Sequence, residues 1–484
     1  MNSKTDSVPL NGAVYWLDEA LAIEDQPACP PLVGEVTADV CIVGGGYLGL
    51  WTAIEILEQA PDTRVVLIEA DGCGFGASGR NGGQTTGWHD ELDVLIRLYG
   101  VEEGLRLAQR SSWAIDRVVD FCDQYEIDAH IRRHGMTKAA VNKYQIGKWR
   151  NAVQACDDHG RGDLLVEVDG LELRRRTGSP LPLSGATQTD GATLQPALLA
   201  RGLRRVALQL GAKIYEGTPM AGLSRSQPAQ VRTTAGCVTA DQVVLAIGAW
   251  MGQVRELRRA FVPIGSSIVV TEPLGKRLLD RPFANGSGFG DQRLSVHHMQ
   301  VTPDGRLIFG RGGGPLGPAG KITPSVLYDP RSMRSIAKDL RRWFPDLADA
   351  KITHAWSGAV DRAPSHLPFL GHLGDHSNIH YASGISGNGV APTAYLGRVL
   401  GRMVLNMEDA DTRSPLTHGP TEYLPPEPFR SVGGAVVRAM VERIENLQEM
   451  GLRLNVNKPM KKLISTTTPR LLEPRLWGRG DANR

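Results

Sequence analysis

The spacing of apolar residues near the start of the chain predicts a strand, a helix and a second strand. A short apolar run at 39–43 is typical of a buried strand, and residues 47–60 then follow a helical period that ends before Pro61. The apolar face of this helix consists of Leu50, Trp51, Ile54 and Leu57. A second apolar run at 64–69 completes one half of a doubly wound α/β domain.

The later segments alternate between this pattern and a different one, which indicates two interleaved domains in 484 residues. We expect a Rossmann-like nucleotide-binding domain, and its segments are 36–105, 186–255 and 355–410. We expect an α+β substrate domain with a mainly antiparallel sheet, and its segments are 106–185 and 256–354. One hairpin of that sheet joins strands at 293–301 and 306–310. Residues 1–35 are interpreted as a lead-in, and 90–185 as mainly helical.

The last segment, 411–484, is predicted to hold a helix and a basic tail. One face of the helix consists of Val436, Met440, Ile444 and Leu447. Beyond Gly451, eight Lys and Arg residues accompany only Glu473 and Asp481. Either the helix docks on its own domain and the tail is solvated, or the tail binds a partner subunit or an acidic membrane surface.

Composition narrows the class of protein. Lys and Arg number 54 against 52 Asp and Glu, and this balance argues against nucleic-acid binding. Six cysteines lie far apart without a C-x-x-C pair, so neither a disulfide framework nor a metal site is indicated. The chain shows no secretory signal pattern and no apolar run long enough for a transmembrane segment, so we expect a cytoplasmic protein.

The first chemical motif is Gly44-x-Gly46-x-x-Gly49, directly after the first strand. Glycines there permit a tight turn, a close approach of backbone N–H groups to a pyrophosphate, and close helix–strand packing. Glu69 ends the next strand, where its carboxylate can accept hydrogen bonds from a ribose diol. The motif therefore predicts a bound dinucleotide.

Two further glycine-rich segments favour FAD, held in a domain of the glutathione-reductase type. The first, 76–84, follows the acidic residue closely and can pass beneath the ribityl chain and ring. The second, 384–390, precedes a helix whose positive end would stabilise charge on a reduced flavin. The chain has no second G-x-G-x-x-G, which argues against a separate NADPH site. The FAD contacts predicted from these segments and from 243–250 are Ala77, Ser78, Arg80, Asn81, Gly82, Gly83, Gln84, Gly248, Gly384, Gly387, Asn388, Gly389 and Val390.

With these motifs in place, residues 36–410 resemble the D-amino-acid oxidase/glycine oxidase superfamily of FAD-dependent oxidoreductases. Residues 76–84 and 386–389 look like its γ-glutamylputrescine oxidoreductase branch. A subgroup of aminophosphonate oxidoreductases is more similar still. The segments that carry this similarity are Thr193–Pro196, Thr271–Pro273, Trp356–Gly358, Asp361–Arg362, Arg413–Leu416 and Pro425–Pro428.

The resemblance implies oxidation of a C–N bond by hydride transfer to flavin N5, followed by hydrolysis of the imine. The reacting amine must be neutral, and free alkyl amines titrate at about 10, so binding has to lower that pKa. An anionic group elsewhere on the substrate, held by Arg or Lys, would supply the binding energy. Arg311 and Arg362 are the candidates for that cation. His298, which alternates with His297 along a strand, and the pair Trp88–His89 are candidates for proton movement or for lining the site.

The chain departs from its relatives at several positions. It has His298-Met299-Gln300 where relatives carry Tyr-Tyr-Arg, which puts their substrate in doubt. No cysteine follows Cys237, and Arg80–Asn81 replace the histidine that other members use for attachment, so noncovalent FAD is expected. No lysine lies at 306–309, where oxygen-reactive members place one. Oxidase and dehydrogenase therefore both stay open, with O2, a quinone or another protein as acceptor.

Several functions are compatible with this pattern. The preferred hypothesis is oxidation of a small amine with a distal anionic group, an aminophosphonate being the first candidate. γ-Glutamylputrescine or an N-methyl amino acid is the alternative substrate. A non-catalytic flavoprotein subunit that docks through the basic tail is an alternative of another class, and an NAD(P)-dependent dehydrogenase is a third.

Overall fold

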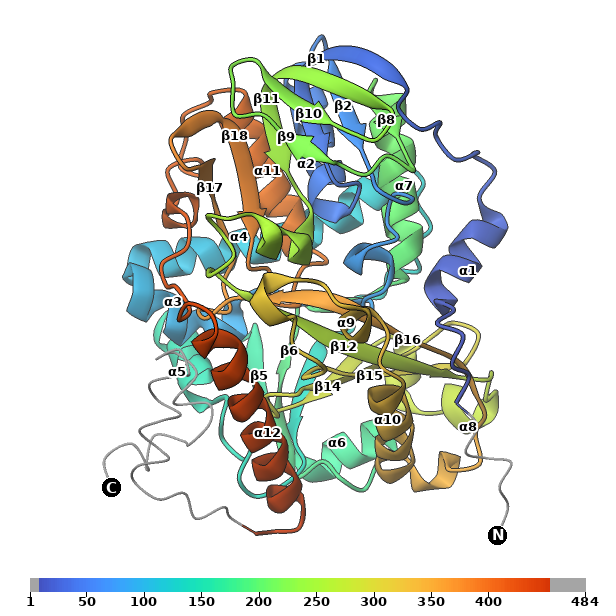
Figure 1. Cartoon of the computed structure of the whole chain (residues 1–484). Helices are drawn as coiled ribbons and strands as arrows, with labels where there is room; N and C mark the ends of the chain where they lie inside the picture. The colour runs from blue at the N-terminus through green and yellow to red at the C-terminus, as the bar shows by residue number, and fades with distance from the viewer. Residues whose placement is uncertain (1–7, 453–484) are drawn as a thin grey trace.

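The computed structural model describes residues 8–452, which form two sheets with helices around them (Figure 1). The first sheet has the strand order β17-β18-β11-β1-β2-β8, with β9 and β10 attached to β11. Its strands are β1 (Gly34–Val43), β2 (Val65–Ile68), β8 (Lys213–Tyr215), β9 (Gly222–Leu223), β10 (Ala229–Arg232), β11 (Gly236–Leu245), β17 (Phe369–Leu373) and β18 (His376–Ser383). The strands β8, β2, β1, β11 and β18 are parallel, so the predicted doubly wound domain is confirmed.

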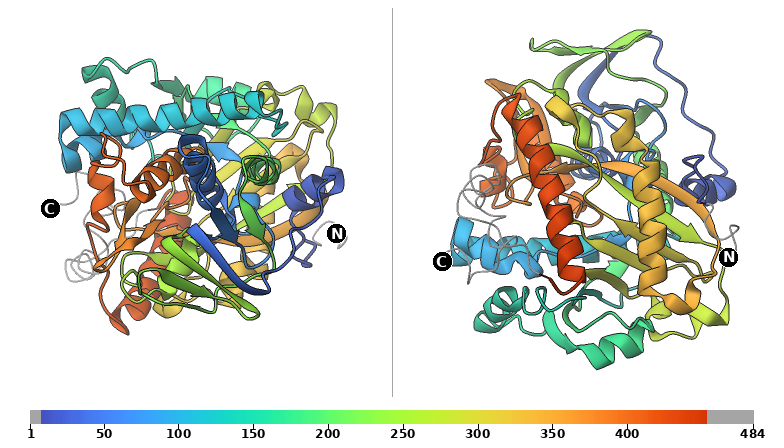
Figure 2. Two further views of the ribbon diagram at one scale, coloured as in Figure 1. Left: turned by 90° about the horizontal axis from the view of Figure 1, so that it is seen from above. Right: turned by 60° about the horizontal axis from the view of Figure 1, so that its bottom comes forward.

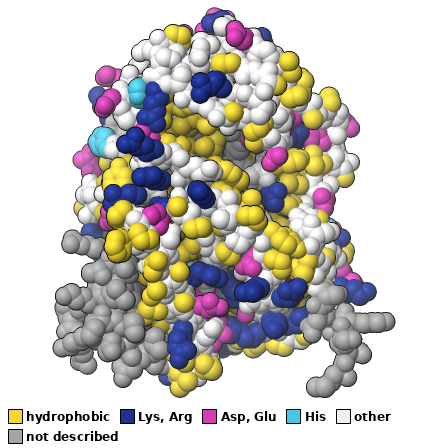
Figure 3. Space-filling model, viewed as in Figure 1, with side chains coloured by type: hydrophobic (Ala, Val, Ile, Leu, Met, Phe, Trp, Pro, Cys, Tyr) yellow, Lys and Arg dark blue, Asp and Glu magenta, His cyan; other side chains and the backbone are white. Residues whose placement is uncertain are grey.

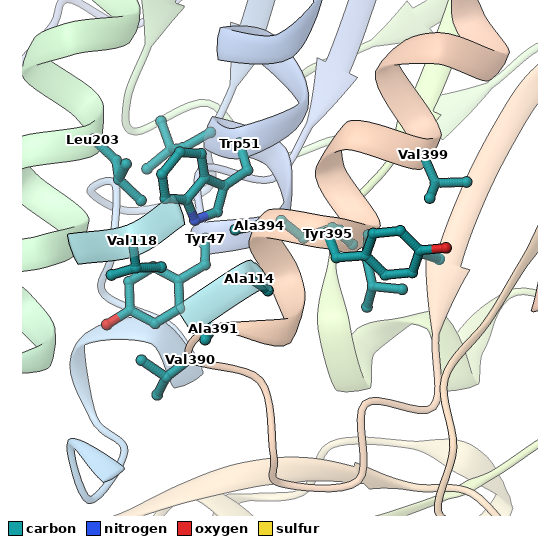
Figure 4. Packing of buried hydrophobic residues seen from close by; sticks show 14 of the residues in the cluster. Tyr47, Trp51, Ala114, Val118, Leu203, Val390, Ala391, Ala394, Tyr395 and Val399 are labelled. Carbon is teal, nitrogen blue, oxygen red and sulfur yellow. The ribbon is translucent and has the colours of Figure 1, made fainter. Parts of the chain in front are cut away.

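Helices cover one face of this sheet, and the hairpin β9–β10 lies against the other. The covering helices are α2 (Tyr47–Gln59), α4 (Val101–Gln124), α7 (Pro196–Gln209) and α11 (Pro392–Val404). Their apolar side chains interlock in one buried cluster, in which Trp51 and Val118 lie close to Tyr47 (Figure 4). The strands alternate as period-two packing requires: Ile42 faces the helices while Cys41 faces the hairpin side.

The second sheet has the order β16-β12-β15-β14-β13-β4-β6-β5 and lies below the first in Figure 1. Its strands are β4 (Met136–Ala140), β5 (Leu165–Asp169), β6 (Ser184–Gln188), β12 (Val262–Thr271), β13 (Gly288–Asp291), β14 (His297–Val301), β15 (Leu307–Arg311) and β16 (Ile352–Arg362). Every neighbouring pair is antiparallel except β4 with β13, which confirms a mainly antiparallel substrate sheet. Helix α10 (Pro330–Trp343) packs against one face of this sheet.

Several other elements are short. They are α3 (Leu92–Tyr99), α5 (Arg150–Asp158), α6 (Gly170–Thr177), α8 (Lys276–Leu279), α9 (Pro324–Leu327) and the strand pair β3 (Gln84–Thr85) and β7 (Ala192–Thr193). No helix within residues 8–452 is long and apolar enough to cross a membrane.

The structure differs from the expected segments at four places. Residues 90–185 are mainly helical as expected, but β4, β5 and the start of β6 also lie within them. Helix α4 runs through the boundary at 105 and packs on α11, so it helps to cover the first sheet. Strand β16 pairs with β12, which moves residues 355–362 into the second sheet. The lead-in contains α1 (Tyr15–Ile23), whose aromatic side chains are buried against α7 and the second sheet.

The predicted C-terminal helix is present as α12 (Phe429–Glu449). It crosses the lower part of the molecule beside α10 (Figure 2). An ion pair between Arg342 of α10 and Glu449 joins the two helices. The helix is therefore docked on its own chain, as in the first of the two interpretations. The basic tail lies outside the described residues.

Candidate active site

A single cavity of about 1520 Å³ runs from the carboxyl ends of the first sheet across one face of the second sheet. Parallel α/β sheets bind ligands at this edge, where the strands end and the helices begin. The three glycine-rich segments of the sequence all reach this cavity, although they lie far apart in the chain.

The first segment is closed so tightly that only glycine fits. A Cβ atom on Gly49 would lie 1.9 Å from the carbonyl oxygen of Gly44, and Gly44 itself has a φ of +111°. Helix α2 begins after Gly46, the hydroxyl of Ser78 accepts the N–H of Tyr47 at 2.8 Å, and all three residues line the cavity, so the positive end of the helix dipole lies at the cavity. Glu69 accepts the N–H of Gly45 at 2.6 Å and lines the cavity, and its oxygens keep lone pairs for a ribose diol.

Two tryptophans fix the second segment from outside the cavity. Trp16 of α1 donates from Nε1 to the carbonyl oxygen of Asn81 at 2.9 Å. Trp356 of β16 donates to that of Arg80 at 2.8 Å. Gln300, from the altered hairpin, donates to the carbonyl oxygen of Gly82 at 2.7 Å. The substituted hairpin position therefore supports the backbone of this loop.

The third segment is held by the Asp361–Arg362 pair. The buried carboxylate of Asp361 accepts the N–H groups of Gly384, Ile385 and Ser386 at 2.7, 3.1 and 3.2 Å. Arg362 donates from Nη1 to the carbonyl oxygen of Ser386 at 2.9 Å. Helix α11 begins just beyond, where Thr85 accepts the N–H of Ala391 at 3.1 Å, and the flanking residues Val390 and Thr393 line the cavity, so its positive end also lies there. The start of α2 fits the pyrophosphate of FAD, and the start of α11 fits the electron-rich edge of its ring.

Most predicted FAD contacts line the cavity. Those that do are Gly44, Gly46, Glu69, Ala77, Ser78, Arg80, Asn81, Gly82, Gln84, Gly248, Gly387, Asn388, Gly389 and Val390. Gly49, Gly83 and Gly384 do not line it, because each packs against protein atoms instead. Their role is to allow the backbone to approach closely.

A row of residues crosses the cavity face of the second sheet. The strand register aligns Lys138 of β4, Gly290 of β13, His298 of β14, Gly310 of β15 and Ile268 of β12. His298 lines the cavity, and its ring lies against Gly310 and Gly82, where a Cβ atom would come within 2.1 and 2.5 Å of it. Burial, together with the neighbouring His297, lowers the pKa of His298 to about 4. The imidazole is therefore neutral at physiological pH.

His297 and Arg311 lie on the opposite face of the sheet, as strand alternation requires. His297 is buried between Asp291 (Nδ1–Oδ2, 2.7 Å) and Asp339 of α10 (Nε2–Oδ2, 3.1 Å). Arg311 donates to the same carboxylate of Asp339 at 2.6 Å. Arg311 therefore does not meet His298 in the cavity, and of the two predicted cations only Arg362 lines it.

His89 is also withdrawn from the cavity. Its buried ring lies 3.3 Å from the hydroxyl of Ser112, and burial lowers its pKa. The neighbouring Trp88 does line the cavity, as does Arg362. Of the four predicted catalytic residues, the structure thus brings together His298 and Arg362, and not Arg311 and His89.

The charge network behind the sheet gives a prediction about stability. Leucine in place of His297 would leave Asp291 and Asp339 buried without the imidazolium between them. We expect the free energy of unfolding to fall by about 3–5 kcal/mol, measured as a lower Tm. An unchanged Tm at about pH 5.5 would contradict the network's role in stability.

The pH dependence of this effect follows from the pKa shifts. Burial lowers the pKa of His297, but the two carboxylates have the larger effect and raise this pKa above 6.5. The stability that His297 contributes is therefore lost as the pH rises through its raised pKa. Burial raises the pKa of Asp291 and Asp339, but the imidazolium outweighs it and holds them below 3.8, so their contribution is lost at lower pH. The difference in Tm between wild type and variant should be largest between about pH 4 and 6.5.

Comparisons with known proteins agree with this geometry. Residues 39–403 match the DAO family of FAD-dependent oxidoreductases, and the chain belongs to this family. It is 30% identical over 393 residues to gamma-glutamylputrescine oxidoreductase of Escherichia coli strain K12, covering 80% of this chain and 88% of that protein. It is 31% identical over 410 residues to a probable oxidoreductase, OrdL, of Rhizobium meliloti strain 1021, covering 82% and 89%. The fold is that of glycine oxidase from Geobacillus kaustophilus, with a TM-score of 0.64 at 19% identity over 79% of this chain and 98% of that one.

The protein is accordingly an FAD-dependent oxidoreductase of amines or amino acids. Three features of its site were not anticipated from the sequence. Lys138 reaches the cavity from a segment expected to be helical, Trp16 reaches the second glycine segment from the lead-in, and Asp361 holds the third. Of these three residues, only Asp361 could have been found from the sequence, because it belongs to the Asp-Arg pair that resembles the family's.

Proposed function

We propose that the protein oxidises a primary amine that carries a distal anionic group, an aminophosphonate being the first candidate. The observation that supports this most directly is the row from Lys138 to His298 on the cavity face. The two residues are separated by two strand spacings, about 10 Å. This is a separation of the two backbones, and the side chains of Lys138 and His298, which both line the cavity, shorten the gap that a molecule with an amine near His298 and an anion near Lys138 has to span.

FAD held by the three glycine-rich segments would supply the hydride acceptor. The protein has to present the amine in its neutral form, since an ammonium group has no lone pair to assist hydride loss. The uncharged imidazole of His298 can accept a hydrogen bond from the amine as it binds. The buried walls around it disfavour the ammonium form, which lowers the pKa of the substrate amine.

Lys138 is the cation that we assign to the distal anion. Its ammonium group forms an ion pair with Asp90, and both residues line the cavity. With 38% of its side chain exposed, Lys138 can turn towards a ligand. A phosphonate oxygen would replace a carboxylate oxygen in this pair, so the charge on the lysine stays compensated.

Substitutions of this pair test the assignment. Methionine in place of Lys138 should raise KM for an anionic amine about 10- to 100-fold, the value of one charged hydrogen bond, and leave neutral amines unaffected. Asparagine in place of Asp90 should lower KM or leave it unchanged, because it removes the competing carboxylate. Steady-state kinetics with 2-aminoethylphosphonate and an uncharged alkylamine measure both. Equal losses on the two substrates would show that Lys138 does not bind the anion.

γ-Glutamylputrescine is a second candidate, favoured by the relative that is 30% identical over most of both chains. Its carboxylate lies farther from the oxidised amine than the phosphonate of 2-aminoethylphosphonate does. Anaerobic mixing of the purified protein with each compound separates the two candidates. Loss of the visible flavin absorbance with 2-aminoethylphosphonate would support an aminophosphonate substrate. Loss with γ-glutamylputrescine alone would show that γ-glutamylputrescine is the better candidate.

Other properties stay predictions. These are noncovalent binding of FAD, electron transfer to O2 or to another acceptor, a cytoplasmic location, and a homo-oligomer or a partner contact through the basic tail. Release of the flavin on acid precipitation, with none left on the polypeptide, is the expected result for noncovalent binding.

A further inference from the structure

Helix α12 lies outside the segment that matches the family, which ends at residue 403, yet it reaches the cavity. Two of its side chains, Ile444 and Gln448, line the cavity. They lie one helical turn apart and therefore share one face of α12. Ile444 is only 8% exposed, although it lies near the end of the helix.

Other side chains of α12 are turned to solvent. Near its start, Phe429, Val432 and Val436 are 70%, 62% and 42% exposed, and hydrophobic side chains are visible in this region of the surface in Figure 3. Glu442 and Asn446 each lie two residues from Ile444, and therefore on the opposite face of the helix, and they are exposed as well. The burial of Ile444 is therefore specific to the side that faces the cavity.

Three contacts attach α12 to cavity-lining segments. Glu445 accepts the N–H groups of Leu294 and Ser295 at 2.9 and 3.2 Å, in the loop between β13 and β14. Arg438 donates to the carbonyl oxygen of Gly313 at 3.2 Å, just after β15. Tyr144 donates to the carbonyl oxygen of Gly451 at 3.1 Å, which ties the end of the helix to the loop after β4.

Ion pairs strengthen this attachment. Arg293, buried in the same β13–β14 loop, pairs with Asp291 at 3.0 Å and with Glu449 of α12. Glu449 also pairs with Arg342 of α10. Because Asp291 contacts His297, the position of α12 is coupled to the strand that presents His298 on its other face.

We propose that α12 forms the outer wall of the substrate cavity, and that Ile444 and Gln448 select substrates by the size and polarity of the end farthest from the amine. The proposed selection of substrates by Ile444 and Gln448 rests on the proposed function, whereas the role of α12 as a wall of the cavity does not. Substrates with a short distal arm end before this wall, and longer ones contact it. An extension beyond the family domain thereby adds a specificity element to a shared active site.

The wall is tested with a pair of matched double variants of the FAD-loaded protein. Ile444→Ala/Gln448→Ala shortens the two cavity-facing side chains, and Glu442→Ala/Asn446→Ala makes the same change on the solvent face. Acrylamide quenching of the flavin fluorescence should increase about twofold or more in the first variant and stay unchanged in the second. Equal quenching in both variants would overturn the wall.

The selection is tested with Ile444→Trp and, as its control, Asn446→Trp. Along a series from 2-aminoethylphosphonate to 5-aminopentylphosphonate, Ile444→Trp should lower kcat/KM about tenfold for the longest amine and hardly at all for the shortest. The same loss along the whole series, or no loss, would overturn the selection. If no amine reduces the wild-type flavin, both the proposed function and the proposed substrate selection are wrong. The quenching experiment still shows whether α12 forms a wall of the cavity.

Discussion

Alanine in place of Gly49 is expected to give a protein without FAD. The added Cβ would lie 1.9 Å from the carbonyl oxygen of Gly44, and this atom belongs to backbone that cannot rotate away. Helix α2 would have to move off β1, which displaces the N–H groups that approach the pyrophosphate. The visible flavin absorbance per mole of purified protein measures the effect.

The control for this substitution is alanine in place of Gly312. That residue also lies at the cavity, but a Cβ there would meet no atom within 4 Å. The Gly312 variant should keep its FAD. Full flavin content in the Gly49 variant would mean that this turn does not hold the dinucleotide.

Alanine in place of His298 should lower the rate of flavin reduction by the amine about 10- to 100-fold, the value of one hydrogen bond to a charged group. FAD should remain bound, because none of the hydrogen bonds that fix the glycine segments involves the His298 side chain. Anaerobic stopped-flow absorbance measures the rate. Alanine in place of His354, a histidine of β16 that does not line the cavity, should change it little.

The pH profile separates a chemical role of His298 from a packing role. Burial and the neighbouring His297 lower its pKa to about 4, so the imidazole is neutral above that value. The wild-type rate should increase with pH only as the substrate amine loses its proton, with no step from this imidazole above about pH 5. If His298 assists deprotonation, the variant should need a higher pH to reach its maximum. A uniform loss at every pH would contradict that role.

The nucleotide-binding half of the fold was predictable because its signals are local. A strand, a glycine turn and a helix follow one another in the sequence, and Gly44, Gly46 and Glu69 lie where the pattern predicts. Strand alternation also predicted that His297 and His298 point to opposite faces, as they do. These features need no knowledge of which distant segments pair.

The substrate half was less predictable, and Arg311 shows why. The hairpin register pairs Arg311 with His297 and Gly310 with His298, so Arg311 and His298 cannot face the same cavity. The strand order determines which other residues lie near His298. Lys138 is aligned with it only because β4 pairs with β13, which lies about 150 residues later in the chain. Pairing at such a distance leaves no periodicity in the sequence, and the same is true of the bond from Trp16 to the second glycine segment.

The central claim is that three distant glycine segments would hold one FAD in the cavity that His298 also lines, where it would oxidise an amine. The most direct measurement is the visible spectrum of the natively purified protein, recorded anaerobically before and after addition of 2-aminoethylphosphonate and γ-glutamylputrescine. We predict a flavin spectrum that one of these amines bleaches and that oxygen or another acceptor restores. A colourless protein that cannot be reconstituted with FAD, or a flavin that neither amine reduces, would contradict it.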